Sequence, residues 1–502
     1  ILVKDALKVL NKEPDLQPVT ETEILKVLYR LVMQDSIVVE ENRVYITKQH
    51  QEEEDTASMI ARKLHEQIPA LTIEKELEEA QEDLNITLSE QQKEAVRMVF
   101  ANPISIITGG PGTGKTTVLK IILYIYQKKC GNEVKLMAPT GRAARRMAES
   151  TGSGDATTMH MALGLFGDGD YEVLIDELSA DFINVDEVSM VDMHLAYEFF
   201  YKVKAGARVL LVGDVHQLPS VGAGDVFRHL ILCGKIPVTV LKLVYRQGKD
   251  SNIPINAQLI NEGKTNLQWG DDFQMVECSG ADAAAQIVKN IYLKEIQMYG
   301  MEQVQILSPY KVRSAAGVLE LNRSLQDEVN PPVSGKRELH LGGVIFREGD
   351  RILQNKNTEF ASNGDLGTLV QIAEDEDNNP LVQIVFTDGR RVKYEAEQVE
   401  MIEHANAITI HKSQGSECQV VIIPWLKAFY PMLKRNIFYT GITRAKQRVY
   451  IVGEWKAVCQ AIHTDDTGTR KTMLAVKIQQ YYERYRRQEN RRIPATICNR
   501  AV

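Results

Sequence analysis

A glycine-rich stretch, Gly109–Thr116 (GGPGTGKT), has the residue types and spacing of a loop that binds phosphate groups. Glycines allow the backbone to curl so that successive N–H groups point at phosphate oxygens, and a helix that starts after the loop adds its positive N-terminal end. The apolar run Ile104–Ile107 precedes the loop and a helical pattern follows it from Thr117, which is the order that this chemistry requires. We therefore expect Lys115 to reach the β- and γ-phosphates of a nucleoside triphosphate and the Thr116 hydroxyl to ligate Mg²⁺.

Two further polar groups follow apolar runs downstream. Asp186 and Glu187 come directly after the run 182–185, where one carboxylate can hold Mg²⁺ through water and the other can take the proton from an attacking water. Gln217 lies in a loop after the run 209–212, and its neutral amide can orient water and sense the γ-phosphate. Acidic pairs alone are common on protein surfaces, and a glutamine is common in loops. Together with the glycine-rich loop upstream, these side chains predict hydrolysis of a nucleoside triphosphate.

These side chains require a framework of parallel strands. From residue 104 onward, short apolar runs alternate with helical stretches, which predicts a parallel sheet covered by helices; a second alternation begins near 304–307 and resumes at 420–423 and 449–452. Residues 344–404 contain β-like segments with Gly, Asp and Asn turns, which predicts a small antiparallel barrel inserted into the second domain. The β-like segments are 351–353, 368–370, 382–386 and 391–394. The predicted fold class is α/β.

The first 50 residues predict a small winged-helix-like piece. Thr20 and Glu23 have the spacing of a capping box before a helical pattern, and residues 37–46 read as a hairpin. Such a unit can bind DNA, but its helix carries acidic residues and few basic ones, so we favour a packing role. Because the chain starts at Ile1 without methionine, we interpret it as a fragment or a processed product.

Composition limits the classes of function. The 502 residues carry 59 basic and 67 acidic side chains, a net charge of −8, so any nucleic-acid binding must come from a local groove. The six cysteines are scattered without a CxxC pair, which favours a reducing cytosol over a disulfide framework or a zinc site. No apolar stretch approaches the ~20 residues that a membrane helix needs. We therefore expect a cytoplasmic protein without membrane contact.

The order of these elements resembles superfamily 1 helicases, and most closely the RecD-like (RecD/TraA) group of superfamily 1B. Eight segments resemble that family's motifs in the family's order. They are 88–96 (adenine-reading motif), 138–144 (Ia), 157–160 (Ib), 186–192 (II), 213–221 (III), 245–247 (IV), 409–417 (V) and 439–446 (VI).

This resemblance implies two RecA-like P-loop motor domains that clamp ATP and Mg²⁺ between them. The nucleotide-binding residues would be Gln92, Gly110, Gly112, Thr113, Gly114, Lys115, Thr116 and Thr117, with Thr116 and Asp186 at the metal. The catalytic residues would be Lys115, Asp186, Glu187 and Gln217 from the first domain and the arginine fingers Arg246 and Arg444 from the second. A guanidinium suits that role because it is planar and permanently charged.

The resemblance also implies a track for nucleic acid. Thr140, Arg142 and His160 would grip single-stranded DNA from one domain, and Thr409 and His411 from the other. His160 has the alternative of being a core histidine. Movement 5′→3′ is inherited from the resemblance, as are single-stranded DNA or DNA with a 5′ single-stranded tail as partner. We further expect a bacterial, monomeric motor that acts without RecB and RecC.

The expected domain boundaries follow from the same resemblance. They are 1–55 for a winged-helix-like N-terminal remnant, 56–243 for motor domain 1A with a hairpin or pin (1B) at about 161–181, 244–343 plus 405–502 for motor domain 2A, and 344–404 for an SH3-like domain 2B. Relatives usually carry a longer N-terminal region, so the resemblance implies an N-terminal truncation.

Two positions depart from the family pattern, and two other functions compete. Asn184 replaces an aliphatic residue in the strand before Asp186, and Met161 stands where a basic residue often follows the motif Ib histidine. An RNA helicase of the same superfamily is one alternative, because phosphate and stacking contacts do not separate DNA from RNA. A P-loop ATPase that remodels proteins is another, although the segment 409–417 argues against it.

Overall fold

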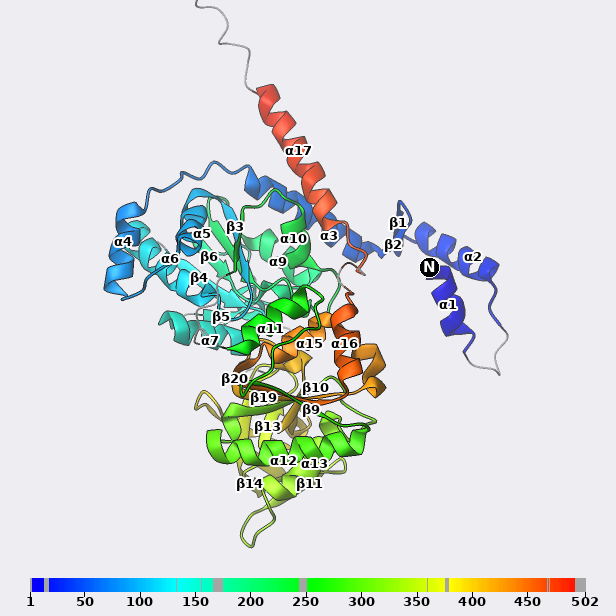
Figure 1. Cartoon of the computed structure of the whole chain (residues 1–502). Helices are drawn as coiled ribbons and strands as arrows, with labels where there is room; N and C mark the ends of the chain where they lie inside the picture. The colour runs from blue at the N-terminus through cyan, green and yellow to red at the C-terminus, as the bar shows by residue number, and fades with distance from the viewer. Residues whose placement is uncertain are drawn as a thin grey trace, which may run out of the picture.

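The computed structural model describes residues 2–12, 18–131, 133–154, 156–165, 175–242, 251–358, 360–374, 379–466, 468 and 470–492. Two α/β lobes lie one above the other, with the N-terminal helices at one side (Figure 1). Among the described residues, no helix has both the length and the apolar character needed to cross a membrane.

The first lobe is built on a six-stranded parallel sheet. In spatial order the strands are β5 (Ala156–Thr158), β4 (Val134–Ala138), β6 (Phe182–Val185), β7 (Arg208–Gly213), β3 (Ile104–Gly109) and β8 (Val238–Leu241). One face packs against α4 (Glu74–Asp83), α5 (Glu90–Ala101), α6 (Lys115–Cys130) and α7 (Gly141–Thr151). The other packs against α3 (Thr47–Leu64), α8 (Met159–Ala162), α9 (Met193–Lys202) and α10 (Val226–Leu232). Burial on both faces explains why the strands are apolar runs rather than alternating patterns.

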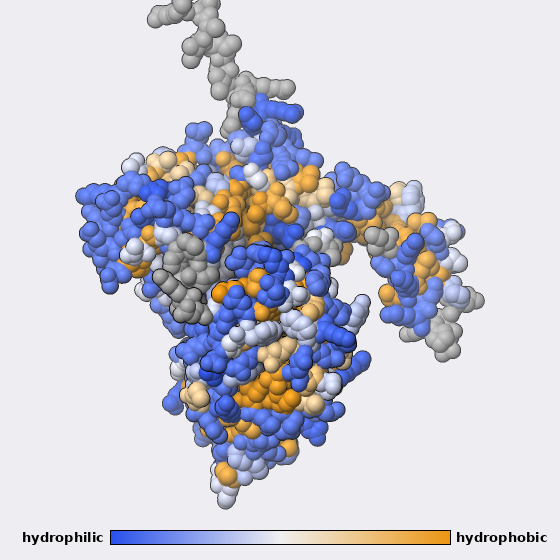
Figure 2. Space-filling model, in the orientation of Figure 1, coloured by the Kyte–Doolittle hydropathy of each residue, from blue (hydrophilic) through white to orange (hydrophobic). Residues whose placement is uncertain are grey.

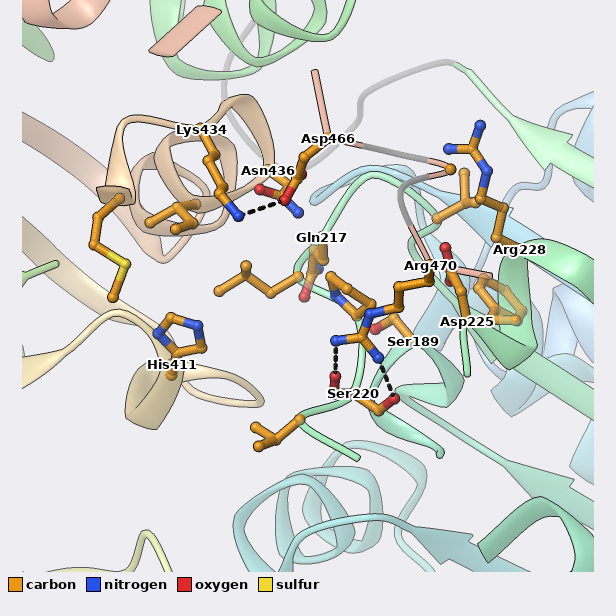
Figure 3. Close-up of a pocket in the computed structure, with 18 residues that line it drawn as sticks. Ser189, Gln217, Ser220, Asp225, Arg228, His411, Lys434, Asn436, Asp466 and Arg470 are labelled. Atoms are coloured by element: carbon orange, nitrogen blue, oxygen red, sulfur yellow. Dashed lines mark hydrogen bonds and ion pairs between the residues drawn. The ribbon is translucent and has the colours of Figure 1, made fainter. Parts of the chain in front are cut away.

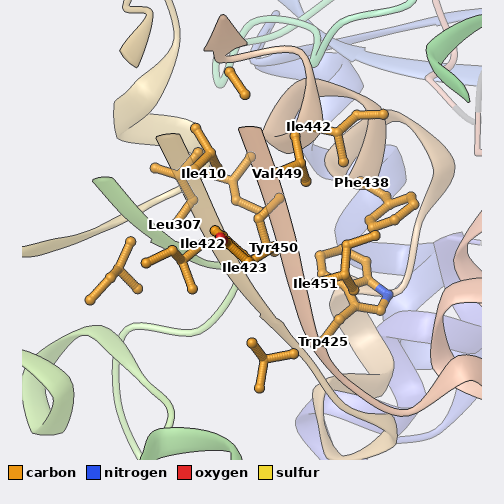
Figure 4. Close-up of a cluster of buried hydrophobic side chains, with 14 of the residues drawn as sticks. Leu307, Ile410, Ile422, Ile423, Trp425, Phe438, Ile442, Val449, Tyr450 and Ile451 are labelled. Atoms are coloured by element: carbon orange, nitrogen blue, oxygen red, sulfur yellow. The ribbon is translucent and has the colours of Figure 1, made fainter. Parts of the chain in front are cut away.

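The second lobe is built on a five-stranded parallel sheet. Its strands in spatial order are β18 (Ala407–Thr409), β10 (Val304–Ser308), β19 (Cys418–Trp425), β20 (Ala445–Gly453) and β9 (Phe273–Glu277). Its helices are α11 (Asn252–Asn261), α12 (Ala281–Tyr299), α13 (Val318–Val329), α15 (Arg435–Ile442) and α16 (Trp455–His463). Trp425, Phe438 and Ile451 lie in its core (Figure 4). The two lobes confirm the predicted α/β class.

An antiparallel sheet is inserted between β10 and β18. Its order is β16 (Arg391–Tyr394), β15 (Pro380–Phe386), β14 (Leu366–Glu374), β13 (Arg351–Gln354) and β17 (Ile402–His404), with α14 (Ala396–Val399) beside it. All four β-like segments predicted from the sequence fall within these strands. A hairpin of β11 (Glu338–Leu341) and β12 (Val344–Arg347) precedes the sheet, and Phe346 belongs to the same core. We call this unit the barrel.

The N-terminal piece contains the expected helix and hairpin. It consists of α1 (Leu2–Leu10), α2 (Glu21–Met33), β1 (Ile37–Glu40) and β2 (Arg43–Ile46), and the capping box between Thr20 and Glu23 is present. Ile24 is the one buried residue of α2, and apolar side chains such as Val9 and Met33 are exposed, as Figure 2 shows for this piece.

Two helices depart from the expected domain boundaries. The helix α3 runs through the expected boundary at residue 55, and its Ala57 and Ile60 are buried in the first lobe. The last helix, α17 (Leu474–Arg492), also packs on the first lobe, where Leu474 and Ile478 join the same core. Assigning all of 405–502 to the second motor domain is therefore wrong for α17, because amphipathicity shows which face of a helix is buried but not against which partner.

Candidate functional site

The glycine-rich loop connects β3 to α6. Gly112 and Gly114 have φ angles of +74° and +84°, which glycine adopts without strain. A side chain at Gly109 would lie 2.7 Å from the carbonyl oxygen of Leu241. Lys115 Nζ donates to the carbonyl oxygens of Gly109 (2.6 Å) and Gly110 (3.0 Å), so the ammonium lies over the loop at the start of the helix. The geometry is that of a preformed phosphate cradle.

Gln92 supports this loop from the preceding helix. Its Oε1 accepts from the backbone N–H of Ser89 at 3.0 Å, and its Nε2 donates to the carbonyl oxygen of Thr113 at 3.3 Å. Both ends of the buried amide therefore bind the protein itself. Contact with a base, which the resemblance implies, stays a prediction.

Two carboxyl groups lie beyond the end of β6. Burial raises the pKa of Asp186 to about 6, and the neighbouring Glu187 carboxylate adds to this shift. Glu187 has a left-handed φ of +52°, and its backbone N–H donates to Asp186 Oδ1 at 2.8 Å. A non-glycine residue held there costs roughly 1–3 kcal/mol, which functional sites often tolerate. In the strand before them, the buried Asn184 donates from Nδ2 to Met147 Sδ at 3.2 Å, which partly offsets the burial of its amide.

A cavity of about 330 Å³ joins these groups at the seam between the lobes. The first lobe contributes Pro111, Gly112, Thr113, Gly114, Lys115, Thr116, Thr117, Ala143, Arg146, Ser150, Asp186, Glu187 and Gln217, and the second contributes Gly415, Glu417, Thr443 and Arg444. Arg444 is 3% exposed, and donates from Nε to the carbonyl oxygen of Thr440 at 3.2 Å. Its guanidinium is thereby held on the second lobe's wall. Arg246, the other predicted finger, lies outside the described residues.

Polar contacts across the seam tie this cavity to the second lobe. Arg146 Nη2 pairs with Glu417 Oε1 at 2.6 Å, and Tyr439 donates its hydroxyl to Asp214 Oδ2 at 2.8 Å. Burial and the Asp214 carboxylate raise the pKa of Tyr439 well above its ordinary value, so the phenol keeps its proton. Sequence reasoning missed Arg146, whose only signal was its place in the arginine pair directly after motif Ia.

The loop that contains Gln217 and Leu218 makes hydrogen bonds with both lobes. Gln217 is 7% exposed and donates from Nε2 to Asp214 Oδ2 at 3.4 Å. The next residue, Leu218, donates its N–H to Thr440 Oγ1 at 2.9 Å and accepts from Gln414 Nε2 at 3.0 Å. Gln217 lines the nucleotide cavity, and the residue that follows it makes two hydrogen bonds with the second lobe.

A second cavity, of about 440 Å³, brings all five predicted DNA-gripping residues together. Its wall includes Thr140, Arg142 and His160 from the first lobe and Thr409, His411 and Lys412 from the second. We call this cavity the groove. His160 is exposed there and is not a core histidine. Desolvation at the groove wall lowers the pKa of His160 and of His411.

The barrel also reaches the groove, which sequence reasoning did not foresee. Asn357, Asn363 and Gly364 line it, and Lys412 Nζ donates to Asn363 Oδ1 at 2.5 Å. Arg142 donates from Nη2 to the carbonyl oxygen of Gly364, so part of its guanidinium binds the barrel and not a ligand. Within the pin expected at about 161–181, residues 166–174, which include the predicted turn, lie outside the described residues.

Two parallel-sheet lobes, with a glycine-rich loop of the phosphate-binding type at their seam and a groove across both, define a two-lobed P-loop protein. Residues 87–281 match the family described as "AAA domain", 404–452 match "UvrD-like helicase C-terminal domain", and 321–386 match "ATP-dependent RecD-like DNA helicase SH3 domain". The chain is a RecD-like member of helicase superfamily 1B.

Named relatives agree with this assignment. The chain is similar to the ATP-dependent RecD2 DNA helicase of Deinococcus radiodurans, with 34% identity over 74% of the chain and 50% of that protein. It is also similar to the RecBCD enzyme subunit RecD of Mycolicibacterium smegmatis, with 28% identity over 76% of the chain and 75% of that subunit. The chain thus spans about half the length of the first of these relatives. Among solved structures, Pif1 helicase from Candida albicans superposes with a TM-score of 0.46 at 18% identity, over 81% of the chain and 100% of that protein.

Proposed function

We propose that the chain is an ATP-dependent DNA helicase that moves 5′→3′ along single-stranded DNA. The observation that carries this proposal is the seam cavity, where Lys115 and Asp186 of one lobe face the same space as Arg444 of the other. A γ-phosphate bound there would bridge the lobes, and its loss after hydrolysis would let them part. Because the groove is lined by both lobes, that movement would change the grip on DNA.

The donor set of the cavity suits Mg²⁺. Thr116 offers a hydroxyl and Asp186 a carboxylate, and hard oxygen ligands of this kind are those that Mg²⁺ prefers. The burial that raises the pKa of Asp186 also fits the metal, because a nearby dication would favour the charged carboxylate. When bound, Mg²⁺ would neutralise charge on the phosphates.

The side chains of the cavity would divide the remaining chemistry. Lys115 would move from its two carbonyl partners to the β- and γ-phosphates, and Glu187 would accept the proton of the attacking water. Arg444 would stabilise the charge that develops on the transferring phosphoryl group. Gln217 would report the γ-phosphate to the loop that follows it, through the contacts of Leu218.

The groove supports binding with little sequence preference. Its candidate contacts are hydroxyl, imidazole, guanidinium and ammonium groups, which bind phosphates and sugars more than base edges. We propose that the protein works in the bacterial cytoplasm as a monomer, without RecB- and RecC-type subunits. Polarity rests on family membership, since no distance in the groove distinguishes one strand direction from the other.

The decisive experiment is unwinding of duplexes that carry either a 5′ or a 3′ single-stranded tail. We expect ATP-dependent separation of the 5′-tailed duplex only. Lys115→Ala should lower the rate of ATP hydrolysis by more than about 10²-fold, because the phosphates lose a positioned cation, while single-stranded DNA binding remains measurable. Lys120→Ala, on the same helix but away from the cavity lining, is the control. Unwinding from a 3′ tail would refute the polarity. Stimulation of ATP turnover by RNA but not by DNA would favour the RNA helicase, and no stimulation by either would favour a protein-remodelling ATPase.

A further inference from the structure

The two lobes are joined a second time near the end of the chain. The first crossing lies between β8, which ends at Leu241, and α11, which begins at Asn252. After β20, the helix α16 packs in the core of the second lobe through Ala457 and Ala461, whereas α17 packs in the core of the first. The described residues between these helices, 464–466, 468 and 470–473, therefore lie on the way from one lobe back to the other. We call this segment the strap.

Both ends of the strap are anchored by polar contacts. On the second lobe, Lys434 Nζ pairs with Asp466 Oδ2 at 2.8 Å, and the backbone N–H of Arg435 donates to the carbonyl oxygen of Thr464 at 3.0 Å. On the first lobe, Thr472 Oγ1 donates to Glu53 Oε2 at 2.5 Å. The strap is thus fixed at each end to a different lobe.

Between these anchors, Arg470 binds one loop of the first lobe through its backbone. Its Nη1 donates to the carbonyl oxygens of Gly222 (2.7 Å) and Gly224 (2.5 Å), and its Nη2 donates to that of Ser220 (2.5 Å). Figure 3 shows the Arg470 guanidinium beside Ser220, with Gln217 and His411 around the same pocket. A guanidinium holds several acceptors at once because its donors form a rigid, permanently charged fork.

The loop that Arg470 holds lies between the two functional cavities. It follows Gln217, which lines the nucleotide cavity, and its residues Ser220, Val221 and Gly222 line the groove. A side chain at Gly222 would lie 2.1 Å from Asp192 Oδ2, so the loop is also confined from its other side. The position of these backbone atoms in the groove therefore depends on the strap.

We propose that Arg470 is a positioning residue that couples lobe movement to the grip on DNA. When the second lobe shifts relative to the first, the strap is pulled at its Lys434 anchor, and Arg470 transmits the shift to the loop 220–224. Arg470 lines neither the nucleotide cavity nor the groove. Its loss should therefore uncouple the sites without removing a group that touches ATP or DNA.

The test compares Arg470→Gln and Arg470→Lys with Lys471→Gln, which removes an exposed charge from the next residue. Steady-state ATP turnover is measured with and without saturating oligo(dT), and thermal unfolding is recorded for each variant. We expect Arg470→Gln to keep its DNA-independent turnover and to lose about tenfold in DNA stimulation of kcat, a coupling loss within the usual range for linked sites. Arg470→Lys should recover part of the stimulation, and Lys471→Gln should match the unaltered protein.

The inference rests on the proposed function, but the two can fail separately. If the unaltered protein shows no DNA-stimulated turnover, the proposed function fails. If that protein is stimulated and Arg470→Gln is stimulated equally, only the role of Arg470 fails. A parallel loss of DNA-independent and DNA-stimulated turnover, with a lower unfolding temperature, would show that Arg470 merely stabilises the fold and would overturn the proposal.

Discussion

Arg444 shows how much of the site depends on a single side chain from the second lobe. Its guanidinium is buried at the seam and held by the carbonyl oxygens of Thr440 and Ser416. We expect Arg444→Ala to bind ATP but to hydrolyse it roughly 10³–10⁵-fold more slowly, because it loses an arginine finger. Equilibrium binding of a fluorescent ATP analogue and single-turnover hydrolysis separate the two effects. Unchanged turnover would mean that Arg444 does not reach the phosphates.

Asp186 carries a cost in stability that depends on pH. Its folded-state pKa of about 6 lies above the ordinary value of 3.8, so ionisation destabilises the folded protein. This penalty is complete above about pH 6 and disappears as pH falls to about 3.8. Asp186→Asn cannot ionise, and it should therefore raise the free energy of unfolding by roughly 1–3 kcal/mol at pH 7.5 while abolishing turnover.

Urea unfolding of the nucleotide-free, metal-free protein at pH 7.5 and at pH 4.5 measures this gain. The gain should shrink at the lower pH, whereas Asp271→Asn, at an exposed carboxyl, should have little effect at either pH. A gain of equal size at both values would show that ionisation of Asp186 is not its cause.

At the residue scale, side chains within recognisable motifs could be named from the sequence in both lobes, whereas side chains outside the motifs could not. Lys115 and Asp186 could be predicted because a loop and a strand end carry them within a recognisable order. Asn363 and Arg470 could not, because each reaches its partner through tertiary packing between segments far apart in the chain. Arg142 was predicted to contact DNA, but one of its guanidinium nitrogens donates to a carbonyl oxygen of the barrel.

Among the elements, α7 joins the first lobe to the barrel. Asp365, with a side chain 1% exposed, forms ion pairs with Arg145 of α7 and with Arg390 of the barrel, the latter at 2.7 Å. Its Oδ2 also accepts from the backbone N–H of Ser362 at 3.0 Å. One buried carboxylate thus fixes the loop that carries Asn363 and Gly364 into the groove.

Removing that carboxylate should weaken both the fold and the groove. We expect Asp365→Ala to lower the free energy of unfolding by roughly 1–3 kcal/mol, because it removes a buried hydrogen-bonded carboxylate while both part-exposed guanidinium groups keep Asp388 as a partner. Weaker binding of oligo(dT) should accompany this loss. Asp388→Asn, which removes a carboxylate that pairs with the same two arginines at greater exposure, should cost less. Equal losses in chemical denaturation would show that Asp365 has no special role.

At the element scale, strands were easier to predict than the partners of helices. Both parallel sheets and the four barrel segments could be located because apolar runs and turn residues are local signals. The start of α3 and the lobe that α17 packs on could not be predicted, since an apolar stripe does not specify its partner. In the packed structure Lys477 of α17 pairs with Glu53 of α3 at 3.2 Å.

For the whole molecule, net charge and groove charge have opposite signs. The chain carries a net charge of −8, whereas Arg142 and Lys412 place basic side chains in the groove. The affinity for single-stranded DNA should therefore fall as salt is added. The logarithm of the association constant should fall with the logarithm of the salt concentration, with a slope of roughly −0.7 per neutralised phosphate, or about −1.4 for these two groups.

Fluorescence anisotropy of labelled oligo(dT) across a salt series measures that slope. Lys412→Gln should make it shallower by about 0.7. Lys311→Gln removes a cation outside the groove lining and should leave the slope unchanged. If both variants change the slope alike, the DNA does not follow the groove.

The return of α17 to the first lobe bears on how the molecule can be divided. Leu474, Ala475 and Ile478 complete an apolar core to which Ala57 and Ile60 also belong. If the gene were split within residues 243–250, the N-terminal fragment would expose the apolar surface that α17 covers. The C-terminal fragment would carry α17 without the lobe that it packs on. When the two fragments are co-expressed, they should associate and purify as a non-covalent heterodimer, whereas either fragment alone should aggregate.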